Sequence, residues 1–207
     1  MISNKTIVLS RDFYDRPTLT VARDLIGKYI IYRIGKNRLS ARIVEVEAYI
    51  RQTDPACHAS RGKTQRNAVM FGHPGFAYIY FIYGMYYCLN FVTEPENQPS
   101  AVLLRAAEPC EGIEFMVKNR PVKDTNDLLS GPGKFCQAFG LTKEQNGLDL
   151  TSDTLYLENR FETVPEVITT SRIGINQAKE LPWSFYDKNS RSVSKLQKQN
   201  KINKKEL

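Results

Sequence analysis

Apolar and polar residues alternate along much of the chain, and this pattern predicts more strand than helix. β-branched and aromatic residues with a period of two are typical of half-buried strands. Turn residues at Gly35 and Gly84 separate two pairs of such segments, so each pair is predicted to form an antiparallel hairpin. The predicted strands are residues 29–33, 39–50, 76–83, 86–93 and 101–106, followed by two short ones at 154–157 and 167–170.

Apolar residues three and four positions apart predict three helices, at 17–26, 111–120 and 132–139. The fold class that follows is α+β. We expect a single compact domain with a mixed, mostly antiparallel, curved β-sheet, surrounding helices and a protruding β-hairpin. Residues 1–190 are assigned to this single domain. The Lys-rich residues 191–207 are predicted to be a basic, mobile C-terminal tail.

The strand at 39–50 carries carboxylates in an otherwise apolar sequence. Alternation predicts two faces for it, with Val44, Val46 and Ala48 on one and Glu45, Glu47 and Tyr49 on the other. A carboxylate such as Glu47, shortly before a histidine-containing loop, is typical of a general base in a pocket. The alternative is that this face simply meets water. Glu45 and Glu47 project side by side, which disfavours a sugar glycosidase, whose two carboxylates flank the scissile bond.

Composition places the chain among folded globular proteins. Its 207 residues are 42% hydrophobic, 11% aromatic and 25% charged, which excludes disordered and collagen-like chains. The net charge is +7, but the segment from Lys188 onward, with seven cations and the single acid Glu206, carries +6 of it. Basic tails are usually solvated segments, so the net charge alone is weak support for a nucleic-acid partner.

The cysteines and the longest uncharged stretch exclude several other classes. The four cysteines form no CxxC pair and there are only two histidines, so no metal site is predicted. The N-terminus lacks a secretory apolar segment, and we expect a cytoplasmic protein with free thiols in a reducing compartment. Residues 67–93 hold no Asp, Glu, Lys or Arg, but Pro74, Gly75 and five tyrosines interrupt them, so no membrane span is predicted.

Aromatic residues are concentrated in the second predicted hairpin. Nine Phe and Tyr residues lie between Phe71 and Phe91, more than one core face can absorb. The surplus aromatic surface suits stacking on nucleobases. His58, in the loop 51–68, is a lone histidine that could equally be incidental. Asn90 and Arg105 lie in apolar strands, where a structural cross-strand pair is the alternative to a functional role.

Taken together, these segments resemble the alkyladenine (3-methyladenine) DNA glycosylase family of monofunctional base-excision enzymes. The resemblance spans residues 8–195 in the family's order. It rests on the following runs: Arg42-Ile-Val-Glu-Val-Glu-Ala-Tyr49, His58, Arg66-Asn-Ala-Val-Met-Phe71, residues 78–90, Val102-Leu-Leu-Arg-Ala-Ala-Glu-Pro109, Ser130-Gly-Pro-Gly-Lys-Phe-Cys-Gln-Ala138, Ser171-Arg-Ile-Gly-Ile175 and Pro182-Trp183.

The resemblance implies a role for each of seven residues. Glu47 would be the general base for the attacking water, and Arg105 would help to position that water. Three side chains would form the base pocket, one would insert into the duplex, and one would exclude the exocyclic amino group of normal guanine. The base pocket would be formed by Tyr49, His58 and Tyr80. Tyr83 would insert into the duplex, and Asn90 would exclude the amino group.

The resemblance also implies the substrate and the outcome of the reaction. Double-stranded DNA containing damaged purines, 3-methyladenine and 7-methylguanine above all, would be hydrolysed to an abasic site without strand cleavage. The excision of hypoxanthine and ethenoadenine stays open. We expect a monomer without a cofactor, located with the nucleoid, and phosphate contacts from Arg61, Lys63, Arg66 and Lys134. The alternatives are a non-catalytic module that binds damaged DNA and a carbohydrate glycosidase.

Overall fold

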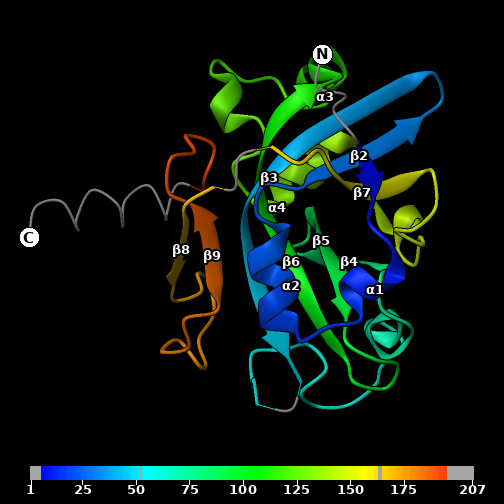
Figure 1. The fold of residues 1–207 in the computed structure, drawn as a ribbon, viewed down its shortest axis with the longest axis vertical. Helices are drawn as coiled ribbons and strands as arrows, with labels where there is room; N and C mark the ends of the chain where they lie inside the picture. The colour runs from blue at the N-terminus through cyan, green and yellow to red at the C-terminus, as the bar shows by residue number, and fades with distance from the viewer. Residues whose placement is uncertain (1–5, 52, 163–164, 195–207) are drawn as a thin grey trace, which may run out of the picture.

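One antiparallel sheet organises the molecule (Figure 1). The computed structural model describes residues 6–51, 53–162 and 165–194. The strands within these residues are β1 (Ile7–Val8), β2 (Tyr29–Ile34), β3 (Asn37–Ile50), β4 (Ala77–Ile82), β5 (Tyr86–Thr93), β6 (Ser100–Glu111), β7 (Leu155–Asn159), β8 (Val167–Thr170) and β9 (Ser184–Asp187). The α-helices are α1 (Arg11–Tyr14), α2 (Thr18–Leu25), α3 (Ile113–Asn119) and α4 (Pro132–Phe139), and short 3-10 turns lie at Ala68–Phe71, Thr125–Asp127 and Lys143–Gln145.

The strand order places β3 and β6 at the centre of the sheet. The path runs β1-β7-β2-β3-β6-β5-β4, and every pairing among the described strands is antiparallel. Strand β3 is long enough to pair with β2 along its first half and with β9 along its second, while β8 adds to β9. In Figure 1, β8 (gold) and β9 (orange) form an arm at one side of the molecule. The predicted α+β class with a mostly antiparallel sheet is confirmed.

The main core lies on one face of the central strands. Val46, Ala48, Val102 and Leu104 cluster there with the apolar side chains of α2 and α4. Because side chains alternate along a strand, the residues between them point to the opposite face. That opposite face holds Tyr49, Asn90, Leu103 and Arg105, and it carries the candidate site described below.

The predicted elements agree with the structure where local turn signals were strong. Both hairpins form, β2 with β3 and β4 with β5, and residues 132–139 and 167–170 have the predicted bounds. Strand β1 was not predicted, because two residues give too little periodicity, and β9 was missed although it is as long as the predicted β8. Within the described residues, no helix combines the length and the apolar character needed to cross a bilayer.

The alternation predicted for β3 is wrong at Val44. The β3–β6 register shifts on both sides of Glu45, which marks a β-bulge. Ile43 therefore joins Val46 and Ala48 in the main core. Val44 packs instead in a separate cluster with Ala106, Tyr186 and Val193. The bulge turns Val44 and Glu45 together toward β9 and the C-terminal segment.

The predicted boundary of the C-terminal tail is also wrong at its start. Ser192, Val193 and Ser194 are buried, with exposed fractions of 1%, 0% and 5%. Val193 fills the cluster around Val44, and Ser194 hydrogen-bonds Glu45. Composition suggested a solvated segment, but a single apolar residue and paired serine donors are enough to pack residues 192–194 onto the sheet. The remainder of the predicted tail, residues 195–207, lies outside the described residues.

Gly112 is a position where the fold requires glycine. It ends β6 and precedes α3 with a φ of +74°, and an added Cβ would meet the Leu39 side chain and come within 3.0 Å of the Arg38 carbonyl oxygen. Gly35 has a φ of +57° in the β2–β3 turn, but a Cβ there would meet nothing within 4 Å.

We therefore expect the Gly112→Ala and Gly35→Ala variants to differ in stability. Gly35→Ala should lower the free energy of unfolding by about 1 to 2 kcal/mol, the cost of a left-handed conformation. Gly112→Ala should lower it by about 1 to 3 kcal/mol more, because the methyl group also clashes with the neighbouring strand. Urea unfolding of the two variants measures the difference, and equal losses would contradict the packing described.

Candidate active site

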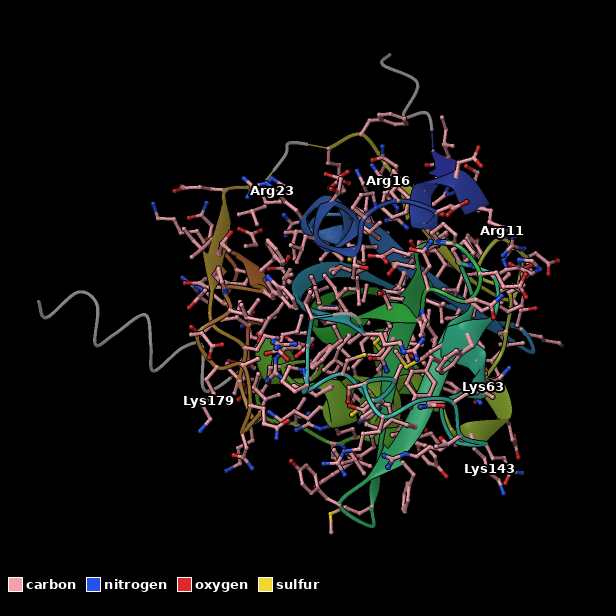
Figure 2. The ribbon with its side chains drawn as sticks, turned by 90° about the horizontal axis from the view of Figure 1, so that it is seen from below. Arg11, Arg16, Arg23, Lys63, Lys143 and Lys179 are labelled. Carbon is pink, nitrogen blue, oxygen red and sulfur yellow. The ribbon has the colours of Figure 1, made fainter. Side chains whose placement is uncertain are left out.

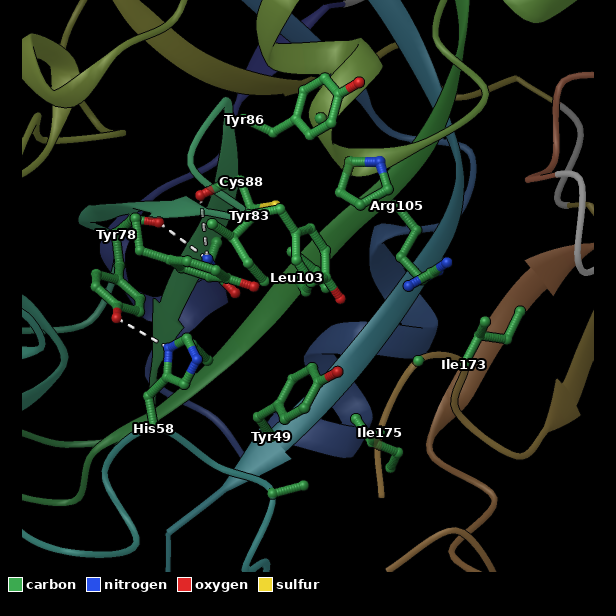
Figure 3. A pocket seen from close by; sticks show the side chains of 18 of the residues that line it. Tyr49, His58, Tyr78, Tyr83, Tyr86, Cys88, Leu103, Arg105, Ile173 and Ile175 are labelled. Atoms are coloured by element: carbon green, nitrogen blue, oxygen red, sulfur yellow. Dashed lines mark hydrogen bonds between the residues drawn. The ribbon is translucent and has the colours of Figure 1, made fainter. Parts of the chain in front are cut away.

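A cavity of about 740 Å³ opens on the sheet face opposite the main core, a size typical of ligand sites. Strands β3 to β6 form its floor, and the loop 51–68, the start of α4 and the loop after β8 form its sides (Figure 3). The lining residues are Tyr49, Ala56, His58, Arg61, Met70, Tyr78, Tyr80, Ile82, Tyr83, Tyr86, Cys88, Asn90, Ala101, Leu103, Arg105, Gly131, Pro132, Gly133, Lys134 and Ile173 to Gln177.

Glu47 lies directly behind the wall of this cavity. It is fully buried and is not itself a lining residue. Its Oε1 accepts a hydrogen bond from the backbone N–H of Ile173 at 2.7 Å, and its Oε2 accepts one from the Tyr49 hydroxyl at 2.9 Å and one from Arg105 Nη1 at 3.3 Å. All three donors belong to residues that line the cavity. The carboxylate is therefore separated from the cavity only by the residues that donate hydrogen bonds to it.

Arg105 lies between two buried carboxylates. Its Nε donates to Glu45 Oε1 at 2.8 Å, while its Nη1 reaches Glu47. Both glutamates are 0% exposed and Arg105 is 8% exposed. Buried charges of this kind are tolerated only when each is paired and hydrogen-bonded, so the three side chains depend on one another. The arginine in an apolar strand is explained by this arrangement.

Burial raises the pKa of Glu47 above its ordinary value. The charge of Arg105, the Ile173 N–H and the Tyr49 hydroxyl each act in the opposite direction and lower this pKa. Burial and the neighbouring Glu47 raise the pKa of Tyr49 well above its usual value, so its hydroxyl stays protonated and donates to the carboxylate. Glu47 is thus a carboxylate with a higher proton affinity than an exposed glutamate.

An aromatic cluster faces Glu47 across the cavity. In Figure 3 the side chains of His58 and Tyr78 lie on one side, and those of Tyr49 and Arg105 on the other. His58 Nδ1 is 3.0 Å from the Tyr78 hydroxyl, and the His58 ring meets the Tyr80 ring edge to face at 4.5 Å between centroids. Desolvation by these rings, together with the Arg66 charge, lowers the pKa of His58, so its ring is neutral at neutral pH.

Asn90 is fixed in the cavity floor on β5. It is buried, and its Nδ2 donates to the Tyr78 backbone carbonyl at 3.0 Å and to the Cys88 carbonyl at 3.5 Å. Across the sheet, Asn90 is in register with Tyr78 on one side and Leu103 on the other, and Leu103 is in register with Glu47. Asn90 and Glu47 are therefore held on the same row of the same sheet.

The β4–β5 hairpin carries an exposed aromatic tip at the rim of the cavity. Tyr83 and Gly84 both have positive φ, at 53° and 67°, as in the type I′ turns that fit a twisted hairpin. Tyr83 is 77% exposed and Met85 is 65% exposed. Gly133 at the start of α4 lets the helix approach the hairpin closely, since a Cβ there would lie 2.9 Å from the Tyr86 ring.

The four predicted phosphate-contacting cations do not occupy equivalent positions. Arg61 and Lys134 line the cavity. Lys63 and Arg66 do not; Lys63 lies over the Phe71 ring and Arg66 over the Tyr80 ring, and Arg66 also donates to the Phe81 carbonyl. Figure 2 shows Lys63 near the surface of the molecule.

Residues 172–177 form a wall that the roles assigned from the sequence did not include. Ile173 to Gln177 line the cavity, and Arg172 anchors them with a fully buried ion pair to Asp54, its Nη1 and Nη2 lying 2.5 and 2.8 Å from the two carboxylate oxygens. The Arg172 guanidinium also lies 4.7 Å from the centroid of the Tyr49 ring. The run Ser171-Arg-Ile-Gly-Ile175 was the only signal for this wall.

The described residues offer neither a metal-ligand group nor a carboxylate on the cavity wall. Among the described residues, no group of three or more His, Cys, Asp or Glu side chains is arranged to hold a metal ion. The part of the cavity wall that the structure describes includes no Asp or Glu, and Glu45 faces Arg105 rather than the cavity.

Comparison with known proteins places this chain in a family. A model of the family described as methylpurine-DNA glycosylase matches residues 12–191. A protein of Methanocella arvoryzae described as "Putative 3-methyladenine DNA glycosylase" is 53% identical over 193 residues, which cover 91% of this chain and 96% of the relative. A protein of Alkaliphilus oremlandii with the same description is 46% identical over 199 residues, covering 90% and 98%.

The chain belongs to the methylpurine-DNA glycosylase family. It is a DNA glycosylase, a hydrolase of DNA repair. The resemblance noted from the sequence motifs is confirmed at the level of the family.

The buried ion triad predicts a pH-dependent stability for an Arg105→Met variant. Removing the cation leaves two buried carboxylates without a counter-charge, which should lower the free energy of unfolding by about 3 to 5 kcal/mol near neutral pH. The pKa of Glu47, already raised by burial, loses the lowering effect of Arg105. The folded variant then binds a proton more tightly than the unfolded chain, so its stability falls as pH rises through that pKa and recovers as pH falls.

Urea unfolding at about pH 8 and about pH 5 measures this effect. Arg105→Lys is the matched control, because it keeps the charge while losing the planar fork, and it should lose less stability with a weaker pH dependence. A loss for Arg105→Met that is the same at both pH values would contradict the triad.

Proposed function

We propose that this enzyme removes alkylated purines from double-stranded DNA by extruding the damaged nucleotide into the cavity and hydrolysing its N-glycosidic bond. The observation that carries this proposal is the position of Glu47, a buried carboxylate whose three hydrogen-bond donors all line one side of a cavity with an aromatic opposite side. A damaged base in the cavity would place its sugar carbon near that carboxylate. The printed descriptions of the relatives name 3-methyladenine, which is the first substrate to test.

Glu47 is assigned as the general base. An ionised carboxylate accepts about four hydrogen bonds, and the contacts with Ile173, Tyr49 and Arg105 use three of them. The remaining acceptor position would take a water proton as the water oxygen bonds to C1′ of the sugar. The C1′–N bond breaks, its electron pair goes to the departing purine, and the proton stays on Glu47. Arg105 would hold the water and keep Glu47 ionised before attack.

The aromatic cluster is assigned as the slot for the extruded base. Tyr49 and Tyr80 would stack on it, and His58, kept neutral, would hydrogen-bond its edge. An alkylated purine that carries positive charge gains about 0.5 to 2 kcal/mol from contact with aromatic faces that a normal base does not gain. Such a base is also a good leaving group, so one carboxylate suffices. Asn90, fixed in the floor by two backbone carbonyls, would exclude the exocyclic amino group of guanine.

The rim of the cavity is assigned to the DNA duplex. Tyr83, exposed at the hairpin tip, would fill the space left by the extruded base and so offset part of the unstacking cost of a few kcal/mol. Arg61 and Lys134 would contact phosphates beside the cavity, and Lys63 and Arg66 phosphates farther along the backbone. We expect the enzyme to act as a monomer. The product is an abasic site in an uncut strand.

The Glu47→Gln variant tests the proposal. The amide keeps the shape of the side chain but cannot take up the water proton, so base release should fall at least about 100-fold. Chromatography of bases released from a 3-methyladenine-containing duplex measures the rate. Lesion-duplex binding should persist, because the cavity wall is unchanged. Glu166→Gln is the matched control, since Glu166 is exposed and pairs with the exposed Lys188, and it should leave the rate unchanged. Wild-type rates from Glu47→Gln would refute the assigned base.

A further inference from the structure

Glu45 is a buried carboxylate that has no role in the proposed reaction. It is 0% exposed and does not line the cavity. Three donors hold it: Arg105 Nε at 2.8 Å, the backbone N–H of Ser194 at 2.6 Å and the Ser194 hydroxyl at 2.9 Å. A charge buried at this depth is costly, and an apolar residue at the same bulge would pack with Val44 without that cost.

The two carboxylates compete for the same guanidinium. Arg105 donates to Glu45 over the shorter distance, 2.8 Å, and to Glu47 over the longer, 3.3 Å. Glu45 therefore holds the guanidinium back from Glu47. A guanidinium free of Glu45 would form a closer, bidentate ion pair with Glu47, which is the preferred geometry for arginine and a carboxylate. Such a pair would occupy the acceptor position that the attacking water needs.

The C-terminal segment fixes Glu45 in turn. Ser194 lies 149 residues from Glu45 in sequence, and both of its hydrogen bonds to the carboxylate are buried. Val193 is fully buried in the cluster with Val44, Ala106 and Tyr186, which anchors the segment beside the bulge. The bulge in β3 is what turns Glu45 toward this segment. A continuous chain of contacts thus runs from Ser194 through Glu45 and Arg105 to Glu47.

We propose that Glu45 and Ser194 are positioning residues, which hold Arg105 away from Glu47 so that Glu47 stays open to water and basic enough to activate it. The inference rests on the proposed function, in which Glu47 is the general base. It assigns the segment 191–194 a part in catalysis although none of its atoms touches the cavity.

We expect the variant Glu45→Gln to shift the acid limb of the pH–rate profile, which general structural damage would not do. Glu45 raises the pKa of Glu47 through its charge, and Arg105 lowers it. Neutralising Glu45 removes the first effect and strengthens the second, so the acid limb of the profile should move to lower pH. The groups that face the two glutamates, all unchanged in this variant, are Arg105 from β6, Tyr49 from β3, Tyr80 from β4, Arg172 from the loop after β8, and Tyr186 from β9, which faces Glu45.

The first experiment compares serine variants in the single-turnover rate of 3-methyladenine release. Ser194→Ala should reduce the rate about tenfold, a fraction of the 100-fold that a displacement of about 1 Å can cause, with the Kd for the lesion duplex unchanged. Ser194→Thr keeps the hydroxyl and should restore the rate. Ser192→Ala is the matched control, because Ser192 is buried in the same segment, its hydroxyl makes no hydrogen bond within the described residues, and its loss should leave the rate unchanged.

The second experiment records the pH–rate profile of Glu45→Gln. We expect a lower plateau rate together with an acid limb at lower pH than in the wild type. An unmoved acid limb, or a Ser194→Ala rate equal to that of Ser192→Ala, would overturn the inference. If Glu45→Gln does not fold, the single-turnover rates of the serine variants alone test the inference.

The outcomes also separate this inference from the function on which it rests. If Glu47→Gln is inactive but Ser194→Ala works at the wild-type rate, the positioning role is refuted and the assignment of Glu47 as general base stands. An active Glu47→Gln would remove both.

Discussion

The ion triad of Glu45, Arg105 and Glu47 is the interaction on which the site depends. Three charges within the sheet, all nearly or fully buried, are stable only as a hydrogen-bonded set. The set needs both central strands, because the glutamates come from β3 and the arginine from β6. It also needs the bulge in β3, which gives the two glutamates different surroundings. The strand pairing that forms the core therefore also aligns the groups of the candidate active site.

Two segments distant in sequence complete the surroundings of the triad. The loop after β8 supplies the Ile173 N–H to Glu47, and Arg172 ties this loop to Asp54 in the loop 51–68. The C-terminal segment supplies Ser194 to Glu45. Both segments help to bury the carboxylates away from bulk solvent, and this burial is the main reason that the pKa of Glu47 is raised. A base of adequate strength is thus a product of the tertiary fold rather than of any one motif.

The sequence was sufficient to predict what local signals and motifs encode. Turn glycines and period-two patterns specified both hairpins, and the motifs around Glu47 and Arg105 identified the family. The bulge at Glu45 could not be predicted, because register is decided by the partner strand rather than by β3 itself. The contacts of Ser194 with Glu45 and of Arg172 with Asp54 span 149 and 118 residues, and no local pattern reports such a contact. The tail boundary was misplaced for the same reason.

The proposed reaction depends on the ionisation of the Glu47 side chain, and carbon-13 NMR of the labelled glutamate carboxyl groups measures it directly. The Glu47 resonance, assigned by its loss in Glu47→Gln, should titrate at a pH above the ordinary glutamate range. Its midpoint should coincide with the acid limb of the base-release rate, because the ionised form is the one that accepts the water proton. A Glu47 carboxyl that stays protonated throughout the pH range of activity would contradict the account.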